Sequence, residues 1–250
     1  MCMAPIRQLP ESEIMAVLSG PELARGSRIR HHAPWRHFAL TRGLLRLLLA
    51  YRSGCPPASL DIRDGDGMAP RLAENPGGLN FSVSHSHDWV AVAVGSQPLG
   101  IDIEQVDQQA DCEDIAGVCF HARERAFLRA IAREKRAEAF FDIWTRKEAV
   151  LKATGRGFSA DTLRFSTVPF DGAVTFENAA RDRHRWHVRP LSAPDGYKAA
   201  LASSAPSRDV IYVEAAALAS GGRGPGFHQQ LPPSRSISTA ADRPVAPFCY

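Results

Sequence analysis

Apolar side chains recur at helical spacing in two long segments of the chain. The first segment is 35–51, and the second is 136–153, which is followed by Gly155, a residue suited to ending a helix. We expect a further helix over 112–132 and a shorter one over 10–25, where proline and acidic residues come first. Each half of the chain is therefore expected to contain one dominant helix.

Between these helices the pattern changes to the two-residue alternation that is typical of β-strands. In the first half, two such runs at 79–84 and 89–95 are joined by the polar sequence HSHD, and a third follows at 98–107. Segment 53–80 is rich in Gly, Pro and Asp, so we expect mostly loop with a short strand at 60–63. In the second half we expect strands at 162–167, 172–176, 184–190, 197–203 and 209–215.

Both halves thus combine helices with strands, and the sequence has neither a GxGxxG after a strand nor a P-loop. We predict an α+β fold of two similar lobes, each a small sheet packed with helices. The N-terminal lobe is expected to span 1–105 and the C-terminal lobe 106–219. Residues 220–250 are poor in core-forming side chains and rich in Gly, Pro and Ser, so we expect a disordered tail without a part in the chemistry.

The composition limits the classes of function that fit. The chain has 250 residues, 44% hydrophobic and 23% charged, with a net charge of +3, which is ordinary for a globular protein. No basic stripe interleaved with aromatic residues indicates nucleic-acid binding, and the longest apolar run, LLRLLLA, is too short to span a membrane. Five scattered cysteines without a CxxC pair, and no signal pattern, indicate reduced thiols and a cytoplasmic location.

The strand expected at 98–107 carries two acids on one face. Asp102 and Glu104 are two residues apart, so their side chains leave the same side of the strand and repel each other. One interpretation is a charged sheet edge that discourages aggregation. The other is a site for a hard divalent cation, which prefers clustered carboxylate oxygens and would relieve the repulsion. The two acids alone leave both interpretations open.

The helix expected at 136–153 carries a third acid among its apolar positions. On a helical wheel Glu148 projects inside the arc of the large apolar side chains, Lys147 leans inward, and Lys152 lies at the edge of the arc. An exposed pair of Glu148 and Lys152 would fit the four-residue spacing but not this position. A glutamate and lysines at a buried boundary favour a metal and phosphate site.

The sequence FSVSHSHDW supplies polar groups of another kind. Zinc binding is disfavoured because no cysteine lies nearby, and Ser84 and His85 are adjacent on a strand end, so they cannot pair as nucleophile and base. Hydroxyl, imidazole and turn N–H groups do donate hydrogen bonds to phosphate oxygens. Phosphate binding and a plain polar hairpin turn both fit this stretch.

Three motifs together resemble those of the 4′-phosphopantetheinyl transferases. They are VSHS at 83–86, GIDIE at 100–104, and WTRKEAVLKATGRG at 144–157, in the order and spacing of that family. The length and the two halves resemble the monomeric Sfp (surfactin synthetase-activating) type. The resemblance covers about residues 10–213. It implies a fold of two lobes related by a pseudo-two-fold axis and a monomeric protein.

The resemblance also implies a reaction. Such enzymes transfer the 4′-phosphopantetheine group of coenzyme A to a serine of an apo acyl or peptidyl carrier protein and release adenosine 3′,5′-bisphosphate. They require Mg²⁺, and Mn²⁺ is a possible substitute. The residues that match the metal ligands are Asp102, Glu104 and Glu148, and Glu148 also matches the acid proposed to deprotonate the carrier serine.

The remaining matches concern coenzyme A. Lys152 matches the lysine on the pyrophosphate, and Ser84 and His85 match residues near the phosphates. Lys147, which precedes Glu148, is a further candidate for binding coenzyme A. For the 3′-phosphate the candidates are basic residues near the N-terminus, which are Arg36, Arg25 and Arg28. Many family members carry Gly-Lys-Pro before the first motif, but this chain reads GDGMAPRL at 65–72, without the lysine.

Two other functions fit parts of the pattern. The first is a coenzyme A- or carrier-binding module without catalysis, although the intact acids and Lys152 argue against loss of activity. The second is a magnesium-dependent nucleotide phosphohydrolase, which would not need a docking surface for a carrier. We expect such a surface near Val106–Phe120. The mild positive charge of the chain fits the acidic recognition helix of carrier proteins.

Overall fold

A computed structural model describes most of the chain before residue 222. The described residues are 1–29, 31–64, 70–75, 77–155, 160–170, 172–177, 183–206 and 210–221. The expected disordered tail therefore lies outside the described residues, apart from its first two positions. The lysine-free loop at 65–72 is described only from residue 70 onward.

The strands of the described residues form three antiparallel sheets. The first has the order β1 (Cys2–Pro5), β5 (Trp89–Gly95), β4 (Asn80–Ser86). A small second sheet pairs β2 (Ile62–Arg63) with β3 (Arg71–Leu72). The third has the order β6 (Leu99–Gln105), β9 (Tyr197–Ser203), β8 (Arg183–Pro190), β7 (Ala173–Glu177).

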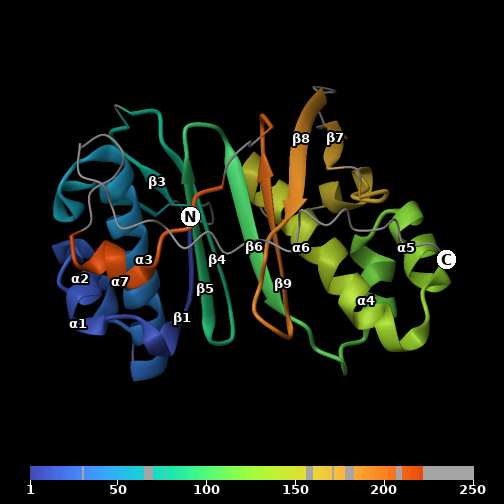
Figure 1. Ribbon diagram of the computed structural model, residues 1–250, viewed down its shortest axis with the longest axis horizontal. Helices are drawn as coiled ribbons and strands as arrows, with labels where there is room; N and C mark the ends of the chain where they lie inside the picture. Colours follow the sequence, from blue (N-terminus) through green and yellow to red (C-terminus); the bar gives the residue numbers. More distant parts are fainter. Residues whose placement is uncertain are drawn as a thin grey trace.

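The helices lie on two sides of the strands (Figure 1). On one side are α1 (Glu11–Met15), α2 (Gly20–Gly26), α3 (His32–Ser53) and α7 (Ala215–Ala219). On the other side are α4 (Cys112–Cys119), α5 (Ala122–Ala130) and α6 (Arg136–Thr154). Short 3₁₀ turns occupy Ile6–Gln8, Pro57–Ser59, Arg133–Lys135 and Ala160–Arg164. The coarse prediction of an α+β fold with small sheets and helices is confirmed.

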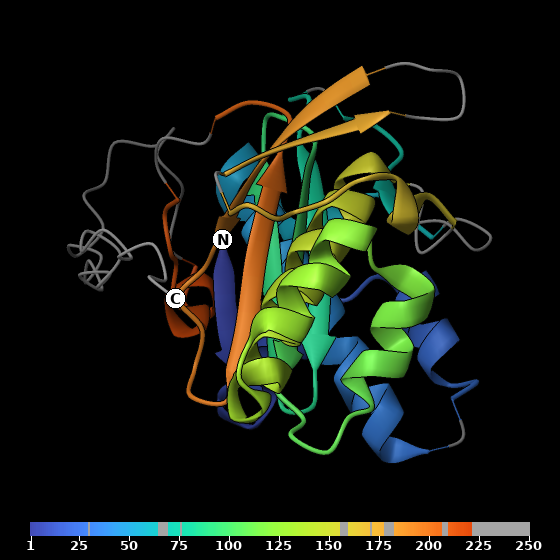
Figure 2. The same cartoon turned by 90° about the vertical axis from the view of Figure 1, so that its right-hand side faces the viewer.

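The two dominant helices are where the periodicity predicts them. Leucines along α3 pack on β1 and β5 in one core, and α6 packs on β6 and β9 in another. Both helices end at a glycine with positive φ, Gly54 at 75° and Gly155 at 69°, a conformation that few other residues adopt without cost. Figure 2 shows α6 lying across the strands.

Several expected elements differ in the structure. The single helix over 112–132 is two helices, because Phe120 is extended and His121 begins α5 with a capping box, its backbone N–H donating to Glu124 at 2.8 Å. The helix over 10–25 is likewise two short ones, since Ser19 and Glu22 form a capping box at the start of α2.

Two expected strands are wrong. Residues 160–164 form a 3₁₀ turn in place of a strand over 162–167. The alternating sequence at 209–215 forms no strand over its described residues 210–214, where the backbone N–H of Val213 donates to the Met1 carbonyl, and α7 begins at Ala215. Local alternation of apolar residues does not by itself make a strand, which needs a continuous ladder of backbone hydrogen bonds to a neighbour. At 210–214 the bonds join the segment to Met1, just before the start of β1.

The first and third sheets meet along β4 and β6, and serine side chains connect them. The backbone N–H groups of β6 donate to the hydroxyl oxygens of alternate residues of β4. The three bonds are Ile101 to Ser82 at 3.1 Å, Ile103 to Ser84 at 3.4 Å, and Gln105 to Ser86 at 3.0 Å. We call Ser82, Ser84 and Ser86 the serine ladder. The ladder places β6 between β4 and β9, and β9 is the strand that pairs with β6 through backbone hydrogen bonds. The sequence predicts β6 at the end of the N-terminal lobe.

Gly100 allows α6 to lie directly on β6. A Cβ at this position would be 2.5 Å from the amide nitrogen of Ala153 and closer still to the carbonyl oxygen of Ala149. Backbone atoms of a helix cannot move aside without moving the helix. The glycine of GIDIE therefore sets the distance between the helix and the strand that carry the acids.

Gly100→Ala is expected to lower the free energy of unfolding by about 1–3 kcal/mol, the usual cost of overpacking a core. Urea denaturation measures this loss. Gly117→Ala is the matched control, because nothing lies within 4 Å of its Cβ position in α4 and alanine favours a helix. Equal stability of the two variants would contradict the close approach.

Candidate functional site

A cleft of about 570 Å³ lies where β4, β6 and α6 meet. Its lining residues are Val83, Ser84, His85, Asp102, Glu104, Trp144, Glu148 and Lys152. The structure thus brings together six of the residues that the sequence singles out, from three segments far apart in the chain. Asp102 and Glu104 share one face of β6, and Glu148 and Lys152 are one turn apart on α6.

Asp102 is the most buried of the three acids, with 2% of its surface exposed. Its Oδ1 accepts hydrogen bonds from Lys152 Nζ at 2.6 Å and from Ser84 Oγ at 2.7 Å. Its Oδ2 is also buried, and it accepts no hydrogen bond from the described residues. Burial raises the pKa of Asp102, against the opposing effect of the Lys152 ammonium.

The other two acids are half-buried and share this environment. Burial, followed by the charge of Asp102, raises the pKa of Glu104 above its ordinary value. The same two causes raise the pKa of Glu148 to about 7. Hydrogen bonds from Ser86 and Trp144 partly offset the effect at Glu104. Three carboxyl groups therefore face one cleft in which their negative charges are mutually unfavourable.

This donor set fits a hard cation in its chemistry. Carboxylate oxygens are what Mg²⁺ prefers, and a cation would relieve both the repulsion and the unpaired Oδ2 of Asp102. Across the described residues, however, no three His, Cys, Asp or Glu side chains are already gathered closely enough to hold a metal ion. Lys152 instead supplies the positive charge at Asp102. The predicted ligand set stays a prediction.

Ser84 and His85 occupy different positions in the cleft. Ser84 is buried and accepts a hydrogen bond from Lys152 Nζ at 2.8 Å. His85 is exposed, and its ring meets His37 of α3 edge-on, with 4.4 Å between centroids. Burial, followed by the charge of Lys152, lowers the pKa of His85, which keeps its imidazole neutral at neutral pH.

Lys147 does not reach the cleft. Its side chain is 3% exposed and points into the other side of α6, where Nζ donates to the Phe165 carbonyl at 2.9 Å and pairs with Glu124 at 2.9 Å. Glu124 is fully buried and also accepts hydrogen bonds from Thr167 and His121. In this arrangement Lys147 connects α6 to Glu124 of α5 and to Phe165, and it is not among the residues that line the cleft.

The N-terminal arginines also lie outside the lining of the cleft. Arg36 donates to Glu11 at 2.6 Å, Arg25 pairs with Asp64, and Arg28 is exposed after the end of α2. The neighbouring Arg42, which the sequence did not single out, is buried, and its Nη1 has no hydrogen-bond partner among the described residues. In the sequence, Arg42 stands four residues before Arg46, and this spacing could have indicated that both arginines lie on one face of the helix.

Two further residues of the cleft were missed as functional residues. Trp144 lines it and hydrogen bonds with Glu104, although the sequence suggested only a core position. His37 approaches it through His85. Trp144 stands four residues before Glu148, so the shared helical face was a usable signal; nothing local marks His37.

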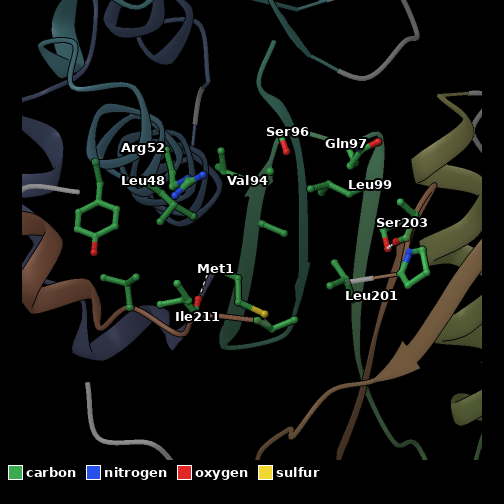
Figure 3. A pocket seen from close by; sticks show the side chains of 17 residues that line it. Met1, Leu48, Arg52, Val94, Ser96, Gln97, Leu99, Leu201, Ser203 and Ile211 are labelled. Carbon is green, nitrogen blue, oxygen red and sulfur yellow. Dashed lines mark hydrogen bonds between the residues drawn. The ribbon is translucent and has the colours of Figure 1, made fainter. Parts of the chain in front are cut away.

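A second cavity, of about 280 Å³, lies on the other face of the strands (Figure 3). Leu99 and Leu201 line it together with Leu48 and Val94, and Arg52 is at its edge. Because side chains alternate along a strand, Leu99 points away from the side that carries Asp102. This cavity is mainly apolar and contains none of the candidate residues.

Comparisons with known proteins agree with the site. The sequence model of the 4′-phosphopantetheinyl transferase superfamily matches residues 98–202, which include β6 and α6. The 4′-phosphopantetheinyl transferase HetI of Nostoc sp. is 37% identical over 202 residues, covering 77% of this chain and 82% of HetI. The chain belongs to the 4′-phosphopantetheinyl transferase superfamily. The resemblance indicated by the three motifs is confirmed, and with it the expected class of enzyme.

Further members of the superfamily show similarity over most of the chain. A 4′-phosphopantetheinyl transferase of Bacillus subtilis is 28% identical over 204 residues, or 81% of this chain and 89% of the relative. The transferase Sfp of Bacillus subtilis is 26% identical over 204 residues, with the same coverage. The Sfp type is thus confirmed as well.

Other expectations concern the surroundings of the protein. The four described cysteines, Cys2, Cys55, Cys112 and Cys119, are free thiols, as expected, and Cys249 lies outside the described residues. In the described part of the chain, none of the helices has the length and apolar character needed to cross a bilayer.

Proposed function

We propose that this protein transfers the 4′-phosphopantetheine group of coenzyme A to a serine of an apo acyl or peptidyl carrier protein, with Mg²⁺ as cofactor and Mn²⁺ as a substitute. The observation that carries the proposal is the meeting of Asp102, Glu104, Glu148 and Lys152 at one cleft. The superfamily membership supports the same reaction.

The reaction forms a bond from the carrier serine oxygen to the phosphorus that bears the pantetheine arm. The bond from that phosphorus to the adenosine bisphosphate breaks, and its electron pair leaves with the bisphosphate. Glu148 accepts the serine proton, for which its half-buried carboxylate in the cleft is placed. No nucleophile from the enzyme is required, because positioning and charge neutralisation provide most of the catalysis.

The other residues bind and orient coenzyme A. Asp102, Glu104 and Glu148 would hold the metal ion, which when bound neutralises charge on the pyrophosphate. Lys152 places its ammonium group beside the leaving phosphate, and His85 donates an N–H to a phosphate oxygen from the exposed edge of the cleft. Arg25, Arg28 and Arg36 remain candidates for the 3′-phosphate, and each would have to turn toward it.

The finer description of the fold belongs to this proposal. We infer two lobes, 1–105 and 106–219, related by a pseudo-two-fold axis. The pairing of one long helix with each large sheet supports two lobes. Two elements cross these bounds, since β6 pairs with β9 in the third sheet and α7 packs with α3 in the first core. The protein would act as a cytoplasmic monomer. A carrier would dock near Val106–Phe120, where Val118 of α4 is 76% exposed.

The test is to incubate the protein with Mg²⁺, coenzyme A and a panel of apo carriers, and to measure the mass of each carrier. We expect one carrier or more to gain a single phosphopantetheine arm. No gain across carriers of fatty-acid, polyketide and peptide pathways would contradict the transferase proposal. Carrier binding without a mass gain would indicate a non-catalytic module, and phosphate release from nucleotides without a carrier a phosphohydrolase.

Removal of the metal is expected to stop the reaction. With EDTA in excess over divalent ions, transfer should fall by at least ~100-fold, because the charge of the pyrophosphate is then opposed by Lys152 alone. Added Mg²⁺ or Mn²⁺ should restore the rate, and EDTA already saturated with Mg²⁺ serves as the control. Full activity in excess EDTA would rule out the metal-dependent form of the proposal.

A further inference from the structure

The serine ladder between β4 and β6 has a regular relation to the acids of the cleft. Each of its serines accepts a hydrogen bond from a backbone N–H of β6, and we compare the residues that precede those N–H groups. For Ser84 that residue is Asp102, and for Ser86 it is Glu104. For Ser82 it is Gly100, which has no side chain. Two of the three serines of the ladder therefore lie beside a carboxyl group, and Ser82 does not.

At Ser84 the hydrogen-bonding capacity of the hydroxyl is fully used. A serine hydroxyl can donate one hydrogen bond and accept two. Ser84 donates to Asp102 Oδ1 at 2.7 Å, and accepts from Ile103 N at 3.4 Å and from Lys152 Nζ at 2.8 Å. Its side chain is buried. The hydroxyl thus has one orientation that satisfies all three partners, and in it one oxygen of Asp102 is held and the other is left without a partner among the described residues.

Ser86 holds the corresponding position two residues along β4. It accepts from Gln105 N at 3.0 Å and lies 3.4 Å from His87 Nδ1, and its interaction with Glu104 lowers the pKa of that acid. Because the two serines and the two acids have the same spacing of two residues on neighbouring strands, each serine faces its own acid. The register between β4 and β6 is thereby linked to the positions of both carboxyl groups.

We propose that Ser84 and Ser86 are positioning residues, which hold the carboxylates of Asp102 and Glu104 in place for a divalent cation. Partners that orient the ligands of a metal commonly change its affinity by about 10–100-fold when they are lost. Ser82 also connects β4 to β6 through a hydrogen bond, but no acid stands beside it. The inference rests on the proposed function for the identity of the cation, since it assumes that these acids bind one.

The test compares Ser82→Ala, Ser84→Ala and Ser86→Ala in the full chain. Each variant loses one hydroxyl acceptor for a β6 N–H, so all three should lower the midpoint of thermal unfolding, and Ser84→Ala most, because it also loses the bonds to Asp102 and Lys152. Binding of Mn²⁺, followed by the loss of its free-ion EPR signal, should separate them. We expect affinity to fall by about 10-fold or more in Ser84→Ala, several-fold in Ser86→Ala, and less than about twofold in Ser82→Ala.

A variant that keeps the hydroxyl distinguishes the loss of the hydrogen bonds of Ser84 from a change in local packing. Ser84→Thr keeps the hydroxyl and should bind Mn²⁺ within about threefold of the wild type. In the transfer assay the concentration of Mg²⁺ for half-maximal rate should rise in Ser84→Ala in parallel with the EPR result, while the KM for coenzyme A at saturating Mg²⁺ changes less than about twofold.

The outcomes are separable from those of the proposed function. Equal Mn²⁺ affinity in Ser82→Ala and Ser84→Ala overturns the inference, as does a wild-type protein that binds no Mn²⁺. A large rise in the KM for coenzyme A without a change in Mn²⁺ affinity also overturns it, and makes Ser84 a substrate-binding residue. If the wild type binds Mn²⁺ and the variants rank as expected, but no carrier is modified, then the positioning role holds and the transferase proposal fails.

Discussion

Glu148→Gln is expected to reduce kcat/KM for carrier modification by at least ~10³-fold, the largest effect that we predict on activity. The amide has nearly the shape of the carboxyl group but cannot accept the serine proton, and it is a poor ligand for Mg²⁺. Loss of a general base alone costs about 10²–10⁴-fold, and loss of charge at the metal adds to it. Mass spectrometry of the carrier at several times measures the rate.

The control for this variant is Glu138→Gln on the same helix. Glu138 is an exposed residue that pairs with Lys198 at 3.2 Å, and it lies outside the cleft. Its replacement should leave kcat/KM within about twofold. If Glu148→Gln kept more than a tenth of the wild-type rate, neither role assigned to Glu148 would stand.

In the absence of a metal ion, Glu148→Gln should have a higher free energy of unfolding than the wild type. A carboxyl group whose pKa rises on folding, here from an ordinary 4.5 to about 7, binds more protons in the folded state, so its ionisation destabilises the fold as the pH rises above 4.5. In EDTA at pH 8 we expect Glu148→Gln to be more stable than the wild type by roughly 1 kcal/mol, a value reduced for solvent screening at this half-buried side chain. The gain should disappear near pH 4.

Lys147→Met is expected to produce the largest loss of stability. Methionine fills much of the volume of lysine but leaves the carboxylate of Glu124, which is 0% exposed, without its ion-pair partner. Removing one partner of a buried pair costs about 3–5 kcal/mol. For a chain of this size that corresponds to a decrease of about 10 °C in the midpoint of thermal unfolding. Urea denaturation gives the free energy directly.

Two comparisons interpret this result. Lys198→Met breaks the exposed pair with Glu138 and should cost less than about 1 kcal/mol. Adding Glu124→Gln to Lys147→Met removes the buried charge and should recover part of the loss, because the amide oxygen can still accept from Thr167. A Lys147→Met loss no larger than that of Lys198→Met would show that the pair is not held in the interior.

Local pattern was sufficient for the long helices and for the acid pair. The apolar spacing of α3 and α6 and the glycines after them define these helices without tertiary information, and alternation in GIDIE puts Asp102 and Glu104 on one face. Prediction from local pattern was wrong where the structure depends on long-range pairing or on a helix cap. The alternating residues at 210–214 bond to Met1 beside the start of β1 but form no strand, and the capping box at His121 divides a segment whose apolar spacing alone indicates one helix.

Motif spacing and periodicity are local properties of the chain, so they were sufficient to indicate the family, the three acids of the cleft and the helix face from which Glu148 projects. The tertiary structure was needed to choose between the two lysines. On a helical wheel Lys147 leans inward and Lys152 lies at the edge of the apolar arc, but in the structure Lys147 is buried against Glu124 and Lys152 pairs with Asp102. The tertiary structure also decided that Ser84 bonds to Asp102, since a hydroxyl on β4 meets a carboxylate on β6 only when the two sheets are aligned side by side.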